Sequence, residues 1–227
     1  MRDKIMYLLG AVFAVLLTWD LYKIFILVPD EANQGAIFRI IYFHVPSIFT
    51  GFTGFFLALI ASGLYLATGN LAYDAFAASV TEVALAFASV VLATGMIWAR
   101  IIWGVWWAWD ARLTSMLMCW LIYAGYLMLR RAIEEPAQRA RLSAVVSIFG
   151  CVDIVIVWKS IEWWRTQHPA PVLSIRDGGG MAPGMEAPIY FNYLALLCLA
   201  AILVMVRMRQ EKVAREIDSL RRMAHAY

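Results

Sequence analysis

The sequence has little charge. Asp, Glu, Lys and Arg together make up 15% of its 227 residues, whereas 63% are hydrophobic. A soluble domain of this length cannot cover so much apolar surface with polar side chains. The composition therefore excludes an ordinary soluble enzyme, a disordered chain and a nucleic-acid-binding module, and it predicts a protein that lies in a lipid bilayer.

Cysteine is also scarce. Cys119, Cys151 and Cys198 each stand alone within an apolar run, which excludes a disulfide framework and a CxxC redox pair. The sequence contains no CxxCH and no GxxxxGK[ST], so the chain is neither a c-type cytochrome nor an ATPase subunit. We expect the three thiols to be packing residues.

Long apolar segments are what the sequence has in abundance. A bilayer core about 30 Å thick needs about 20 apolar residues per helix. Six segments approach or meet this length, near residues 5–25, 46–67, 75–97, 113–129, 142–158 and 189–206. No small-x-small cleavage site follows the first, so we expect it to remain as a helix. The fold class predicted is an all-α polytopic membrane protein with six transmembrane helices in one domain.

The distribution of positive charge predicts the orientation. With both termini in the cytoplasm, twelve of the 19 Lys and Arg residues fall on the inner side, as the positive-inside rule requires. Residues 98–112 then form an external surface segment, and residues 207–227 form a charged cytoplasmic tail. The external segment near 159–188 ends in a Gly/Pro-rich stretch, 177–188, which we expect to be mobile.

In this topology all ten tryptophans lie in the outer half. They are Trp19, Trp98, Trp103, Trp106, Trp107, Trp109, Trp120, Trp158, Trp163 and Trp164. An interfacial belt is the simpler interpretation, but a belt should occupy both interfaces. If residues 98–112 form a helix along the membrane surface, Trp103, Trp106, Trp107 and Asp110 share one face. Such a face predicts an aromatic platform for a planar, mostly apolar ligand.

Two of the three histidines lie on the same predicted side. His44 and His168 are each close to a proline, Pro46 and Pro169, which restricts the local backbone. A neutral imidazole is a good iron ligand, so the pair could hold the iron of a porphyrin from both faces. The alternative is that each is a surface histidine that binds nothing, which is how we interpret His225 in the tail.

The charged residues near this site have more than one interpretation. Arg100, Arg112, Lys159 and Arg165 could pair with the propionates of a porphyrin or with lipid headgroups. For Asp110 we favour a cap of the helix that begins near Leu113, or a pair with Arg112, over a contact with the ligand.

Two acidic residues, Glu82 and Asp153, lie within predicted helices. Charge there is costly and commonly faces a bundle interior or a partner. We predict that Glu82 pairs with a partner subunit or stays protonated. It is exposed to water instead if its helix starts later than expected.

Three motifs together resemble a known family. The run from Trp103 to Ser115, WGVWWAWDARLTS, is similar to the tryptophan-rich WWD signature of haem-handling membrane proteins. The segments 39–46 (RIIYFHVP) and 162–168 (EWWRTQH) resemble the flanking external histidine motifs of the haem exporter protein C (CcmC) family. The motifs occur in the family's order, and the resemblance covers essentially the whole chain.

The resemblance implies a haem-presenting protein of cytochrome c biogenesis, not an enzyme. It implies that His44 and His168 are the axial ligands of a transiently and non-covalently bound haem b. The residues implied around the haem are Trp98, Trp103, Trp106, Trp107, Trp109, Asp110, Arg112, Trp163 and Trp164.

The resemblance also implies partners and a location. They are the haem chaperone CcmE, the ABC-transporter subunits CcmA and CcmB, and the small membrane protein CcmD, in the bacterial inner membrane. A membrane cytochrome b is a rival class, but it needs paired histidines on spanning helices. A permease subunit that exports haem or another solute is the alternative, although it usually shows broken helices or midplane polar residues.

Overall fold

The computed structural model describes residues 2–169, 173, 181–182 and 184–225. Each of its six α-helices is long and apolar enough to cross a membrane, which confirms the predicted fold class. No strand is found in the described ranges. The helices are α1 (Arg2–Tyr22), α2 (Ile41–Thr68), α3 (Leu71–Ile102), α4 (Ala111–Ala132), α5 (Pro136–Trp163) and α6 (Ala187–His225).

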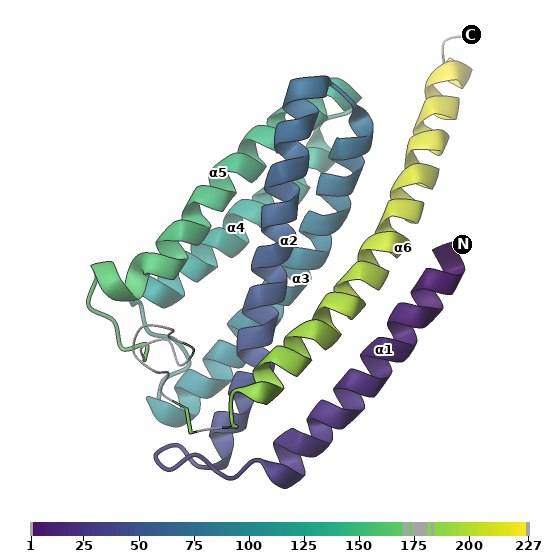
Figure 1. Ribbon diagram of the computed structural model, residues 1–227. Coiled ribbons are helices and arrows are strands. Elements are labelled where there is room, and N and C mark those ends of the chain that lie inside the picture. Colours follow the sequence, from purple (N-terminus) through teal and green to yellow (C-terminus); the bar gives the residue numbers. More distant parts are fainter. Residues whose placement is uncertain (1, 170–172, 174–180, 183, 226–227) are drawn as a thin grey trace.

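Helices α2 to α5 form a bundle, and α1 and α6 run beside each other along one side of it (Figure 1). Helix α1 packs mainly on α6, whereas α6 also contacts α2 and α3. Both chain termini lie toward one end of the molecule. Because the helices alternate in direction, the start of α2, the end of α3, the start of α4 and the end of α5 meet at the opposite end, which we call the histidine end.

The hairpin of α2 and α3 has a two-residue connection. Gly69 has a φ of 69°, and its N–H donates to the carbonyl of Tyr65 at 2.7 Å, which ends α2 in the left-handed conformation that glycine adopts without strain. Asn70 then caps α3 by accepting the N–H of Ala72 at 2.9 Å. So short a link makes the two helices antiparallel neighbours.

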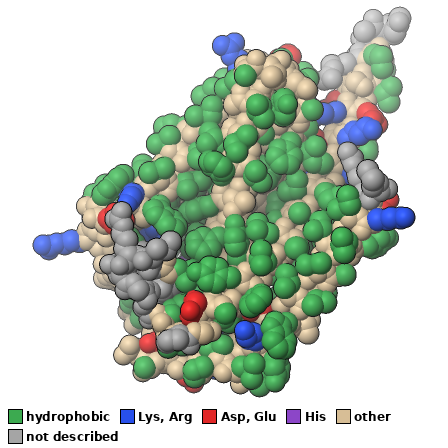
Figure 2. Space-filling view, in the orientation of Figure 1, with side chains coloured by type: hydrophobic (Ala, Val, Ile, Leu, Met, Phe, Trp, Pro, Cys, Tyr) green, Lys and Arg blue, Asp and Glu red, His purple; other side chains and the backbone are tan. Residues whose placement is uncertain are grey.

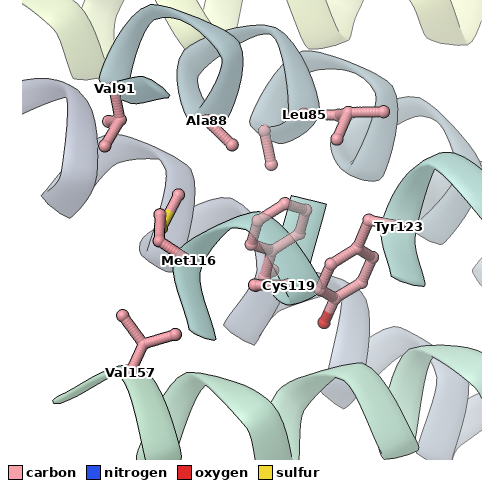
Figure 3. Packing of buried hydrophobic residues seen from close by; sticks show 9 residues of the cluster. Leu85, Ala88, Val91, Met116, Cys119, Tyr123 and Val157 are labelled. Atoms are coloured by element: carbon pink, nitrogen blue, oxygen red, sulfur yellow. The ribbon is translucent and has the colours of Figure 1, made fainter. Parts of the chain in front are cut away.

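Small residues bring these helices close together. A Cβ built on Gly54 would lie 2.7 Å from the Cβ of Ala84, closer than two carbon atoms can pack. The central core beside this contact joins α2, α3, α4 and α5, and Figure 3 shows its side chains pointing toward one another. Phe55 and Tyr123 stack there with ring centroids 3.7 Å apart. This packing makes the bundle a rigid support for the histidine end.

The surface is that of a membrane protein. Hydrophobic side chains spread over the middle of the face shown in Figure 2, whereas charged side chains lie toward its margins. Many large apolar side chains of α1 are exposed, among them Leu8, Val15 and Trp19. In water this surface would be unfavourable, but in a bilayer it contacts lipid.

Residues 98–112 do not form the continuous helix that a shared tryptophan face would require. Helix α3 continues to Ile102, so Trp98 belongs to its last turns, and residues 103–110 form a turn and an extended segment. Gly104 has a φ of 76°, a left-handed conformation that cannot continue a right-handed helix. The tryptophans of this segment therefore do not share a helical face.

Glu82, predicted to pair with a partner subunit or to stay protonated, has an ion-pair partner within its own chain. Its carboxylate pairs with Arg207 of the same chain at 2.6 Å, and the Glu82 side chain is 43% exposed. Arg207 lies within α6, which continues as a helix well beyond residue 206, where the sequence predicted the span to end.

Farther toward the termini, α6 takes part in a buried ion-pair network. Asp74 of α3 is 3% exposed and pairs with Arg130 of α4 and with Arg215 of α6 at 2.7 Å.

Asp153, which the sequence analysis singled out together with Glu82, has one buried carboxylate oxygen with no partner among the described residues. The side chain of His225 and residues 177–180 and 183 of the Gly/Pro-rich stretch lie outside the described residues.

Candidate functional site

His44 and His168 meet at the histidine end. His44 lies in the first turn of α2 and is 8% exposed, and the half-buried His168 follows the end of α5. Both line the same two cavities, of about 100 and 130 Å³. The residues shared by the two cavity walls are His44, Ile48, Trp98, Arg112, His168 and Pro169. The fold therefore brings together the two histidines that the sequence singled out.

The ring of His44 is held by one face of α3. Its Nδ1 lies 2.8 Å from the hydroxyl of Thr94. The ring of Trp98 packs edge-on against it, with centroids 5.9 Å apart. A Cβ on Gly95 would lie 3.3 Å from Cε1 of His44, so the glycine leaves room for the imidazole. With Nδ1 engaged, Nε2 is the remaining ring nitrogen.

His168 is held by its own loop. Its Nδ1–H donates to the carbonyl of Pro169 at 2.9 Å, and its backbone N–H donates to the hydroxyl of Thr166 at 3.0 Å. Burial lowers the pKa of His168 below its ordinary value of 6.5, and the positive charge of Arg112 lowers it further. A neutral imidazole whose Nδ1 is a donor leaves an Nε2 lone pair free to bind a metal.

Asp110 is the N-terminal cap of α4, which is one of the two roles that the sequence analysis favoured. Its Oδ1 accepts the N–H of Leu113 at 2.8 Å, and its Oδ2 accepts the hydroxyl hydrogen of Thr166 at 2.6 Å. The neighbouring Arg112 lines both cavities and donates to the carbonyls of Val157 and Trp158 at the end of α5. These two residues fasten the start of α4 to α5 and to the loop of His168.

The tryptophans of the site divide into two sets. Trp98, Trp103 and Trp107 line the first cavity, and the indole N–H of Trp107 is buried with no hydrogen-bond partner among the described residues. The other four predicted tryptophans are exposed and line neither cavity: Trp106, Trp109, Trp163 and Trp164. The tryptophans that line the first cavity therefore come from the end of α3 and the segment after it.

Of the four cations considered, only Arg112 lines the cavities. Arg100 donates to the carbonyl of Gly104 within its own turn, and Lys159 pairs with Glu162 at 2.7 Å. Arg165 is exposed. An anionic group of a ligand inside the cavities would therefore meet the guanidinium of Arg112 first.

Sequence analysis missed several lining residues. Trp158 lines the second cavity, and Gln34 lines the first and accepts the indole N–H of Trp98 at 2.7 Å. Thr94 and Gly95 precede Trp98 by one turn or less of α3, so they face the same neighbour. The helical spacing of Thr94 and Gly95 relative to Trp98 is visible in the sequence and predicts that the three residues share one face of the helix. It does not predict that this face contacts His44.

The donor set does not suit a bare metal ion. No group of three or more His, Cys, Asp or Glu side chains that could hold one is found in the described ranges. Two imidazoles in an aromatic, apolar cavity instead suit a metal that brings its other ligands with it. A metal complex of a planar macrocycle has this character.

Comparison with known proteins places the chain in a family. The model of the family described as "CcmC: Heme exporter protein C" matches residues 1–223. A heme exporter protein C of Bradyrhizobium diazoefficiens is 34% identical over 95% of this chain and 81% of its own length. The proteins of that name from Escherichia coli K12 and Paracoccus denitrificans are each 31% identical, over 80% and 86% of this chain and 73% and 81% of their own lengths. The chain thus belongs to the heme exporter protein C family.

Proposed function

We propose that this protein binds haem b transiently and non-covalently between His44 and His168 and presents it to an acceptor for cytochrome c maturation. The observation that carries the proposal is that these two histidines line the same cavities, each with Nδ1 engaged and Nε2 left over. Axial ligation of haem iron needs this arrangement. The family name of the relatives supports haem as the ligand.

The residue types that line the cavity suit a porphyrin. Trp98, Trp103 and Trp107 offer ring faces and edges to a flat apolar molecule, and the unpartnered N–H of Trp107 is a donor without an acceptor. The deeper wall is apolar, with Ile48 and Phe52 of α2 among its residues. Arg112 supplies a positive charge for a propionate.

The exposed tryptophans have a different role in this proposal. The tryptophans that are exposed and do not line the cavities are Trp106, Trp109, Trp163 and Trp164. We assign to them, together with Asp110 as the anchor of the loop, the outer part of the haem platform and its docking surface. An acceptor that binds there reaches the ligand without opening the bundle.

The protein acts in this proposal as a platform, not as an enzyme. Its own groups bind the haem, orient it and exclude water from one face, and the site at the bundle end leaves the opposite side open to an acceptor. The acceptor proposed is the chaperone CcmE, in a complex with CcmA, CcmB and CcmD.

The proposed location is the bacterial inner membrane, with both termini cytoplasmic and the haem site on the periplasmic face. The clustering of Lys and Arg toward the end that carries the termini supports this orientation.

A permease subunit is the alternative function. Glu82 does not support the permease alternative, because its carboxylate is paired with Arg207 and lies away from the cavities.

The test is the visible absorption spectrum of the full-length protein purified in detergent from haem-replete cells. We expect a low-spin spectrum typical of two imidazole ligands, altered in both His44→Ala and His168→Ala. His225→Ala is the matched control and should leave the spectrum unchanged. Wild-type haem loading in the double variant His44→Ala/His168→Ala would overturn the proposal.

A further inference from the structure

The hydroxyl of Thr94 has three neighbours. It lies 2.7 Å from the carbonyl oxygen of Val90, 3.2 Å from that of Val91 and 2.8 Å from Nδ1 of His44. A carbonyl oxygen can only accept, and a hydroxyl has one hydrogen to donate. When that hydrogen goes to Val90, the oxygen of Thr94 presents only lone pairs to His44.

This geometry points to one tautomer of His44. If Nδ1 carries the proton, it donates to Thr94 while the hydroxyl donates to Val90, so two hydrogen bonds form. If Nε2 carries the proton, the hydroxyl must turn toward Nδ1 and its bond to Val90 is lost. In a buried site the arrangement with more satisfied groups is favoured.

We infer that Thr94 is a positioning residue that keeps the neutral imidazole of His44 in the Nδ1–H form, with the Nε2 lone pair available for a metal. The inference rests on the proposed function for its purpose, because a metal ligand needs that lone pair. The chemistry of the inference is independent of the proposed function, because it concerns only the side chains of Thr94 and His44. A partner that fixes the tautomer of a ligating histidine also raises the basicity of the ligand.

The surroundings favour Thr94 as the partner of Nδ1 of His44. Trp98 packs edge-on against the imidazole and is itself held by Gln34, and Gly95 lets the ring lie against the backbone of α3. His44 is 8% exposed, so bulk water has little access to Nδ1. Thr94 is therefore the group that decides where the proton of His44 resides.

The two histidines differ in how they are held, and the difference makes the inference testable. His168 donates to the backbone carbonyl of Pro169, which no side-chain substitution removes. His44 depends on a side chain. Thr94→Val keeps the shape of threonine but removes the hydroxyl, and Thr94→Ser keeps the hydroxyl.

The direct experiment uses ¹⁵N NMR of the full chain, labelled at histidine, purified without haem and held near pH 8, well above the ordinary imidazole pKa of about 6.5. With three histidines, single His→Gln variants assign each signal. We expect Nδ1–H for His44 in the wild type and in Thr94→Ser, and a shift toward Nε2–H in Thr94→Val. The tautomer of His168 should not change in any of them.

The second readout is haem retention. Loss of such a partner commonly weakens metal binding 10- to 100-fold. We expect haem to transfer to excess apomyoglobin about 10-fold faster or more from Thr94→Val, and at nearly the wild-type rate from Thr94→Ser. An unchanged His44 tautomer in folded Thr94→Val would overturn the inference. Equal loss of haem from both variants would also overturn it, provided that His44→Ala shows haem binding to depend on His44.

The two proposals fail in different ways. If the tautomer shifts in Thr94→Val but wild-type haem binding ignores His44, the proposed function fails and the role of Thr94 stands. If haem binding needs His44 but the tautomer is the same in both variants, only the role of Thr94 fails. Should Thr94→Val not fold, Thr94→Ala provides the same loss of the hydroxyl with less bulk.

Discussion

The carboxylate of Asp110 joins the start of α4 to the loop of His168 through Thr166. One oxygen accepts the backbone N–H of Leu113 at 2.8 Å, and the other accepts the hydroxyl hydrogen of Thr166 at 2.6 Å. The hydroxyl of Thr166 in turn accepts the backbone N–H of His168 at 3.0 Å. An aspartate of the tryptophan-rich segment thus helps to set the position of a histidine far along the chain.

Two variants separate the functions of this carboxylate. Asp110→Ala removes both the cap and the link to Thr166, and loss of a cap costs about 0.5–2 kcal/mol. Thr166→Val removes the link and leaves the cap. We expect both variants to alter the haem spectrum, but only Asp110→Ala to lower the melting temperature clearly in detergent. Equal melting temperatures would show that the cap contributes nothing to stability.

His168 should titrate below its ordinary range. Burial lowers the pKa of His168 below 6.5, so in the ligand-free protein its ring should take up a proton only at a lower pH. The unfolded chain binds that proton first, so the contribution of His168 to stability is present above pH 6.5 and is lost as the pH falls through the folded pKa. An NMR titration of the His168 ring, assigned with His168→Gln, checks this. A midpoint at or above 6.5 would contradict it.

The buried ion-pair network should contribute to stability without affecting haem. Asp74 is 3% exposed and pairs with Arg130 and Arg215. Removing one partner of a buried pair commonly costs 3–5 kcal/mol. Because Arg215 still pairs with Asp74, we expect Arg130→Met to cost somewhat less, about 2–3 kcal/mol by that scale. Thermal unfolding measures the loss, and the haem spectrum of the folded variant should be that of the wild type.

The close approach of α2 and α3 should tolerate no side chain at Gly54. A Cβ there would lie 2.7 Å from the Cβ of Ala84, so Gly54→Ala must push the helices apart. Overpacking of this kind costs about 1–3 kcal/mol. Gly63→Ala, on the same helix, is the matched control, because a Cβ at Gly63 meets no atom within 4 Å. We expect Gly63→Ala to be neutral or stabilising, so an equal melting temperature for both variants would refute the packing argument.

Part of the site could be predicted from the sequence, and part could not. The histidines stood out because the chain has only three, and Asp110 stood out because an aspartate before an apolar run is typical of a helix cap. Thr94 and Gly95 did not stand out, because a threonine and a glycine in an apolar helix are ordinary. Their importance depends on the neighbour across the α2–α3 interface.

Two details depend on where helices end. Tryptophans at helical spacing would share a face if residues 98–112 formed a helix, but α3 reaches Ile102 and the left-handed Gly104 prevents a helix beyond it. The ion pair of Glu82 with Arg207 involves a helix, α6, that continues beyond residue 206, where the sequence predicted the span to end. Helix ends depend on local hydrogen bonds that periodicity does not report.

Apolar length and composition are enough to predict a six-helix membrane protein, because they alone decide which segments can cross a bilayer. They do not predict that His44 and His168 share a cavity, or that Trp98, Trp103 and Trp107 line it while Trp106 and Trp109 do not. The direction of a side chain in a turn, and the neighbour across a helix interface, follow from the packing of the whole bundle.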